Sequence, residues 1–155
     1  MQLPLLFNFK QIVLGNGFIA GVRMTGRALM EEGDGEVWIN GVSPASIAGG
    51  GQDRTSAFVD FRQGWESVLF DIADGVGSFE EFKGECERFL RSSVASLDRD
   101  WDDALAEVRR LKYTDPSLRT VSADKQTYVI EVCELKPAQS LATKNEVEVG
   151  LAAAA

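Results

Sequence analysis

Histidine is absent from this sequence of 155 residues. Neither a Ser-His-Asp triad nor a Cys-His pair can therefore form within it, and metal sites with a histidine ligand are excluded. The commonest general base of enzymes is also missing. Any catalysis would depend on carboxylates, lysine or an unusual nucleophile. We accordingly expect no catalytic, cofactor-binding or metal-binding residues and predict that the protein is not an enzyme.

Cysteine is scarce as well. Cys86 and Cys133 lie among apolar neighbours and form no CxxC motif, which predicts two buried thiols in a reducing compartment. No apolar run approaches the roughly 18 residues that cross a bilayer. The apolar start of the chain lacks the positive charge and the cleavage site of a signal peptide. These features predict a cytoplasmic protein with no membrane contact.

Basic residues are outnumbered, with 16 Lys and Arg against 24 Asp and Glu, and the net charge is −8. An acidic surface repels nucleic acid phosphates, so we expect no direct nucleic acid binding. The densest cationic run is Arg109, Arg110 and Lys112, followed by Arg119. We interpret it as the last turn of a helix, where cations complement the helix dipole.

The start of the chain has the period-2 alternation of strands. We predict strands over residues 7–14, 18–30 and 35–42, joined by turns at Asn16-Gly17 and Asp34-Gly35. Both dipeptides tolerate the positive φ angles of a type I′ hairpin turn. The first 42 residues are thus expected to form a three-stranded antiparallel meander.

The period then changes to that of helices. We predict a first helix that is capped by Thr55 or Ser56 and ends near residue 73, and a helical extension over residues 78–112. The extension comprises a helix opened by a Ser78–Glu81 capping box and a third helix over 98–112. Six aromatic residues with this spacing are expected in the core: Phe58, Phe61, Trp65, Phe79, Phe82 and Phe89.

Less regular segments complete the chain. Residues 113–126 are expected to form a polar connector, residues 127–135 an additional strand, and residues 136–155 a loose C-terminal tail. The expected order is β-β-β-α-α-α-β within a single domain over residues 1–135. This order predicts an α+β fold in which three helices pack on one face of a small sheet.

The glycine-rich segment GVSPASIAGGGQDRTSAF, residues 41–58, raises the question of phosphate binding. A Walker A loop needs a lysine before its Ser or Thr, and none is present here. Asp53 adds negative charge where a phosphate would lie, and the glycine spacing is not that of a dinucleotide-binding loop. We interpret Gly49 to Gly51 as a flexible turn between Pro44, which ends the third strand, and the first helix.

Acidic residues offer two further candidate sites. DRDWDD at residues 98–103 matches positions 1, 3 and 5 of a calcium loop, but Asp103 replaces the glycine and Arg109 the final glutamate. Acidic residues in a first helical turn are expected from the dipole alone. A two-metal site needs acids at converging strand ends, whereas most acids here are placed on two predicted helices: Asp60, Asp71, Asp74, Glu80, Glu81, Glu85 and Glu87. We interpret them as a solvated helix face.

Residues 8–73 combine three expected antiparallel strands with a late aromatic, a proline-containing loop, a run of glycines, and an acidic residue and a threonine that open a helix. These features are carried by Trp38, Pro44, Gly49 to Gly51, Asp53, Thr55 and Ala57. In this combination the segment resembles the HicB-like antitoxin family. This chain departs from the pattern by inserting Arg54 and by lacking the second proline, and Asp60 lies near the position of the family's glutamate.

The resemblance implies a partial RNase H-like domain without a working acidic cluster, which binds and blocks a small basic ribonuclease toxin. A separate DNA-binding segment is often present in that family. Residues 78–112 are acidic and show no basic recognition face, so no DNA binding is expected here. We therefore expect a non-catalytic protein-binding module whose partner is a small basic protein or a second copy. A homo-oligomeric structural protein and a small carboxylate-metal hydrolase are the alternatives.

Overall fold

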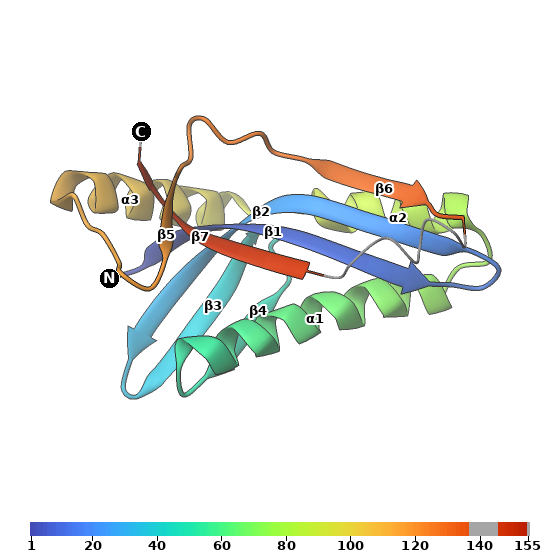
Figure 1. Cartoon of the computed structure of the whole chain (residues 1–155), viewed down its shortest axis with the longest axis horizontal. Helices are drawn as coiled ribbons and strands as arrows, with labels where there is room; N and C mark the ends of the chain where they lie inside the picture. The colour runs from blue at the N-terminus through green and yellow to red at the C-terminus, as the bar shows by residue number, and fades with distance from the viewer. Residues whose placement is uncertain (137–145, 155) are drawn as a thin grey trace.

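A computed structural model describes residues 1–136 and 146–154 and shows an α+β fold, which confirms the predicted class (Figure 1). The described part contains three helices and a mostly antiparallel sheet. The helices are α1 (Arg54–Asp74), α2 (Phe79–Leu90) and α3 (Ala95–Leu111). The strands are β1 (Leu3–Leu14), β2 (Ile19–Gly33), β3 (Glu36–Ser43), β4 (Ala48–Gly51), β5 (Arg119–Ser122), β6 (Ile130–Glu134) and β7 (Glu146–Ala154).

The first two strands form a long antiparallel hairpin that runs through the length of the molecule (Figure 1). Its register pairs Leu3 with Met30 at one end and Leu14 with Ile19 at the other. In the first turn Gly17 alone has a positive φ, of 82°. In the second turn Asp34 and Gly35 both do, at 55° and 78°, as a type I′ turn requires.

The strand order is β4-β3-β2-β1-β7-β5, and β6 also pairs with β2. β2 is longer than its neighbours, and it accommodates two strands along one edge. β6 pairs with Ala20 to Met24, and β3 pairs with Arg27 to Gly33. β5 and β7 form the parallel pair of the sheet. The local sequence pattern therefore specified the hairpin, whereas long-range pairing assembled the other half of the sheet.

One face of the sheet is covered by α1 and α2. Trp65 of α1, which is 1% exposed, packs at the centre of this core. Its ring centroid lies 4.8 Å from that of Phe9 and 5.7 Å from those of Phe7 and Phe89. All six aromatic residues expected in the core belong to this cluster or pack against it. The helical spacing therefore predicted the core of this face correctly.

The opposite face carries a second, smaller core. Leu6 and Leu29 belong to it, whereas their neighbours Leu5 and Ala28 belong to the first core. Successive residues of a strand point to opposite faces, so the two cores lie on opposite sides of the sheet. Trp101 of α3 joins the second core. The expectation of helices on one face holds for α1 and α2, whereas α3 packs mainly on the other.

Three segments differ from their predicted structure. Gly49 to Gly51, expected as a turn, belong to β4, and the connector over 113–126 contains β5. The tail expected over 136–155 is wrong for residues 146–154, because they form β7 between β1 and β5. Leu151 is fully buried there. The rest of that tail, residues 137–145 and 155, lies outside the described residues.

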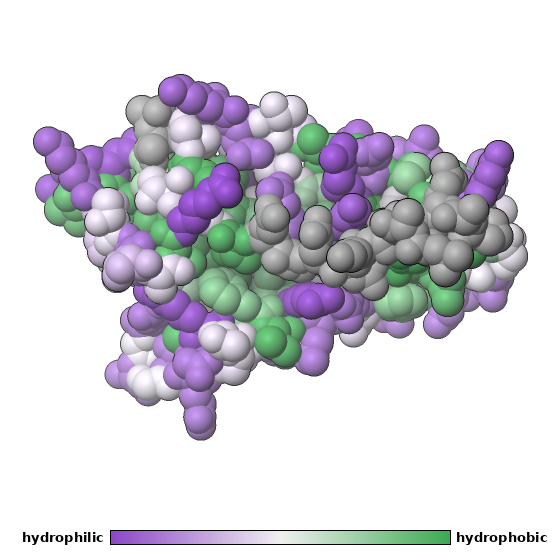
Figure 2. Space-filling view, in the orientation of Figure 1, coloured by the Kyte–Doolittle hydropathy of each residue, from purple (hydrophilic) through white to green (hydrophobic). Residues whose placement is uncertain are grey.

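The surface is mixed in character. On the face shown in Figure 2, hydrophobic side chains gather toward the middle and hydrophilic ones dominate the outline. Among the described residues, no helix is both long and apolar enough to cross a membrane. The start of β1 and the end of β7 lie toward the same end of the molecule (Figure 1).

The position of β7 predicts that its apolar residues stabilise the fold. Leu151→Ala should lower the free energy of unfolding by about 2–5 kcal/mol, because it leaves a cavity in the first core. Leu111→Ala is the matched control, since Leu111 is 47% exposed, and it should cost less than about 1 kcal/mol. Urea unfolding of both variants measures the difference. Equal effects would contradict the placement of β7 in the sheet.

Candidate functional site

The glycine segment lets strand and helix approach each other closely. A Cβ atom on Gly49 would lie 2.6 Å from Cα of Phe61 and 2.8 Å from the carbonyl oxygen of Ala57, both in α1. A Cβ on Gly50 would lie 2.6 Å from the ring of Trp38. The glycines are thus needed for the packing of β4 between α1 and Trp38, and they do not surround a phosphate-sized loop.

Asp53, and not Thr55 or Ser56, is the N-cap of α1. Its Oδ1 accepts a hydrogen bond from the backbone N–H of Ser56 at 2.8 Å, and the hydroxyl of Ser56 accepts one from the N–H of Asp53 at 3.2 Å. This bond from the backbone of Ser56 is the main cause that lowers the pKa of Asp53. The carboxylate that argued against phosphate binding therefore caps the helix.

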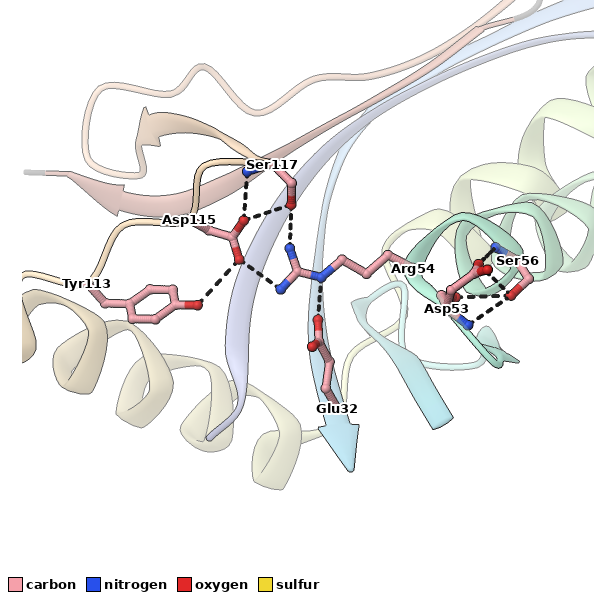
Figure 3. A network of polar contacts seen from close by, with 7 residues as sticks. All are labelled: Glu32, Asp53, Arg54, Ser56, Tyr113, Asp115 and Ser117. Atoms are coloured by element: carbon pink, nitrogen blue, oxygen red, sulfur yellow. Dashed lines mark hydrogen bonds and ion pairs between the residues drawn. The ribbon is translucent and has the colours of Figure 1, made fainter. Parts of the chain in front are cut away.

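Arg54, the first residue of α1, lies at the centre of a polar network (Figure 3). Its Nη2 lies 2.8 Å from Oδ2 of Asp115, its Nη1 donates to the hydroxyl of Ser117 at 2.5 Å, and its Nε donates to Glu32 at the end of β2. The hydroxyl of Tyr113 donates to the same Oδ2 at 3.3 Å. The network joins α1, β2 and the segment before β5.

The network is stabilised as a set of charges. The hydrogen bond from Arg54 is the largest cause that lowers the pKa of Asp115 well below its usual range, and Ser117 adds to it. Asp115 in turn is the main cause that raises the pKa of Arg54. Asp115 is 6% exposed at its side chain, and its two oxygens accept from Arg54, Ser117 and Tyr113. Because both carboxylate oxygens of Asp115 are occupied in this way, we interpret the network as structural and not as a source of a general base. We call the contacts among Arg54, Asp115 and Ser117 the clamp.

An acidic groove lies between the end of α1 and the start of α2. It has a volume of about 560 Å³ and is lined by the carboxylates of Asp71, Glu80, Glu81 and Glu85. Arg88 is the cation among its lining residues, and its Nη1 lies 3.0 Å from Glu85. The sequence placed these acids on two separate helix faces. The tertiary structure brings them to one groove with an excess of negative charge.

The other acids predicted on the helix faces do not line the groove. Asp60 accepts a hydrogen bond from the N–H of Gly50 at 2.9 Å, on the outer side of β4. Glu87 lies near Lys83 and Arg91, at 3.8 Å and 3.7 Å. Asp74, which was also predicted on a helix face, is the last residue of α1 and is exposed.

The segment DRDWDD lies within α3, which begins at Ala95 and not at Asp98. Asp98 is therefore the acidic residue of the first turn, and it pairs with Arg27 at 2.7 Å. Asp100, Asp102 and Asp103 follow along the exposed side of the helix. A continuous helix does not wrap these oxygens around one point, so the segment is not arranged as a calcium loop.

The outer edge of β6 is an open edge of the sheet. Leu135 donates its N–H to Ile19 and Thr25 donates to Val129, so the odd-numbered residues of this strand point their backbone groups toward β2. By the alternation of an antiparallel ladder, Ile130, Val132 and Glu134 point theirs away from it. No strand in the described part of the chain pairs with that edge.

The two cysteines and the predicted cationic run belong neither to the Arg54 network nor to the acidic groove. Cys86 is buried, and burial raises the pKa of its thiol to about 12. Cys133 is exposed, which corrects the expectation of two buried thiols. Arg109 and Arg110 do form the last turn of α3, as predicted, and they pair with Asp124 and Glu107. Lys112 caps that helix and Arg119 begins β5.

The close approach at β4 predicts a steric effect. Gly49→Ala should destabilise the fold by about 1–3 kcal/mol, because the new methyl group would overlap the backbone of α1. Gly33→Ala is the control, since a Cβ there meets no atom within 4 Å. Thermal unfolding of both variants gives the comparison. A Gly49→Ala variant as stable as Gly33→Ala would show that β4 and α1 are not in close contact.

The clamp predicts a pH effect at the acidic end of the range. The pKa of Asp115 is lower in the folded state than its unfolded value of about 3.9. Its ionised form therefore contributes stability above about pH 4, and that contribution is lost as the pH falls toward the folded pKa. Asp115→Asn should lower the free energy of unfolding by about 1–3 kcal/mol at pH 7.

The measurement is the free energy of unfolding of wild type and variant between about pH 2 and pH 7. The difference between the two should narrow progressively below about pH 4, because the unfolded wild type takes up a proton at Asp115 there while the folded form stays ionised. Asp102→Asn is the control, since Asp102 is exposed on α3 and forms no ion pair within the described residues. A difference that is independent of pH would contradict the role of the Asp115 charge.

Comparisons with protein-family models, with curated proteins and with solved structures find no match to this chain.

Proposed function

We propose that this chain is a non-catalytic, HicB-like protein-binding module, antitoxin-like in that it holds a small basic protein. The observation that carries the proposal is the acidic groove between α1 and α2, lined by Asp71, Glu80, Glu81 and Glu85. Complementary charge steers a basic partner toward such a surface and restricts the partners that bind there. The net charge of −8 adds a longer-range attraction of the same sign.

The groove is suited to a protein surface better than to a metal ion. Within the described residues, no three potential metal ligands among His, Cys, Asp and Glu lie close enough together to form a site. The acidic residues that line the groove therefore offer charge attraction to a basic surface and, among the described residues, no clustered set of metal ligands.

Self-association is the second candidate function, and the open edge of β6 favours it. The outward backbone groups of Ile130, Val132 and Glu134 pair with no strand within residues 1–136 and 146–154, and they offer hydrogen bonds to a strand from another copy. Glu131 and Glu134 place charges along this strand, a feature by which proteins limit edge pairing. We therefore prefer the groove as the binding surface for a partner. The β6 edge is the surface that a homo-oligomer would use.

The test is a pull-down from the source cell at low and high salt, with the chain as bait. The wild type should recover a small basic protein at low ionic strength, and a Glu80→Gln/Glu85→Gln variant should recover markedly less because the groove loses two charges. A variant with Asp102→Asn and Asp103→Asn carries the same charge change on the exposed side of α3 and should behave as the wild type. Both variants require an unchanged circular dichroism spectrum.

The outcomes separate the two candidates. Recovery of only further copies of this chain would favour the homo-oligomer and count heavily against the binding module. Equal capture of a basic partner by both charge variants would show that the groove is not its binding surface. A short basic reading frame next to this one in the genome would identify the first partner to co-express.

A further inference from the structure

The two strands that share one edge of β2 leave a gap between them. β6 pairs with β2 as far as Met24, and β3 begins to pair at Arg27. The register between β2 and β3 shifts between Arg27 and Ala28, as at a β-bulge. Such irregularities occur preferentially at the edges of sheets and beside functional sites. Thr25 bridges the gap by donating its N–H to Val129.

A cavity of about 600 Å³ lies at this junction. Four parts of the chain reach it: β2, the end of β3 at Ser43, the segment around Tyr128 and Ile130, and the end of α2 at Arg91. Arg27 and Arg91 are the charged residues that line it, and no acidic residue of the described part of the chain does. Each arginine has an acidic partner outside the lining, Asp98 for Arg27 and Glu87 for Arg91, so the cavity offers two guanidinium groups as donors and no net excess of positive charge.

Arg27 is held in place while part of its guanidinium stays available. Its Nη2 lies 2.7 Å from Asp98, and its Cζ lies 5.1 Å from the ring centroid of Trp101. These contacts fix the guanidinium plane. Its Nε and Nη1 donate no hydrogen bond within the described part of the chain. A guanidinium that is pre-organised in this way loses little entropy when it binds an anion.

The other lining groups can also donate. Arg91 has a side chain that is 60% exposed, and its Nη1 lies 3.7 Å from Glu87, which is too far for a hydrogen bond. The Tyr128 hydroxyl has a single long bond to the carbonyl of Ala123, at 3.5 Å. Burial is the main cause that raises the pKa of Tyr128, so this hydroxyl keeps its proton at neutral pH. The Ser43 hydroxyl makes no bond within the described residues.

We propose that this junction cavity binds a small oxyanion, a carboxylate or a phosphate monoester that is attached to an apolar group. Arg27 and Arg91 supply guanidinium donors, and Ser43 and Tyr128 supply further donors. Planar guanidinium groups match the oxygen spacing of both kinds of anion. Ile130 and the half-exposed ring of Tyr128 line the same cavity and offer apolar contact to the body of the ligand. The site is independent of the acidic groove on α1 and α2.

The experiment titrates the whole chain with phenyl phosphate, benzoate or neutral benzyl alcohol and follows amide and arginine Nε–H signals by NMR. At least one anion should bind with a millimolar Kd and shift the signals of Arg27, Arg91 and Tyr128. Stronger binding of phenyl phosphate identifies a phosphate site, and stronger binding of benzoate a carboxylate site. No saturable shift at about 10 mM of either anion, or equal binding of benzyl alcohol, would overturn the proposal.

Variants test the residues themselves. Arg91→Gln should raise the Kd of the anion by about tenfold, because it removes one charge-assisted hydrogen bond. Arg110→Gln is the matched control, because Arg110 is exposed at the end of α3 and does not line this cavity. The affinity of this variant for the anion should equal that of the wild type. Tyr128→Phe removes one donor, leaves the charges intact, and should weaken binding less. Equal affinities for Arg91→Gln and Arg110→Gln would contradict the site.

Discussion

Backbone hydrogen bonds between β1 and β2, continuous from Leu3 to Leu14, support the rest of the structure. Each of these strands contributes alternate residues to opposite faces, so the hairpin supplies side chains to both cores. Its length also fixes what can be added at its edges. β7 pairs along β1, and β3 and β6 share the far edge of β2. The gap between those two strands follows from that division.

Two kinds of contact attach α1 to the sheet: close packing against small and aromatic residues, and an ion pair at its first residue. Gly49 lets the helix backbone approach β4, and Trp65 packs between Phe7 and Phe9 on the strands. Arg54 then links the start of the helix to the segment before β5 through Asp115.

The distribution of charge follows from this packing. The acids of α1 and α2 face solvent because the apolar sides of both helices are buried against the sheet, and their meeting creates a negative groove. Arg27 of β2 and Arg91, just after the last residue of α2, come from different elements and reach one cavity. Under the two proposals, one acidic chain presents the groove to a basic protein and the junction cavity to a small anion.

The sequence by itself determined the hairpin, the three helices and the first core, because the periodicities of 2 and 3.6 and the turn dipeptides are local signals. It also excluded histidine chemistry. Only the tertiary structure decided that Gly49 to Gly51 form a strand, that residues 146–154 complete the sheet, and that Arg54 meets Ser117, 63 positions away. Those features depend on pairings between distant segments, which no window of neighbouring residues records.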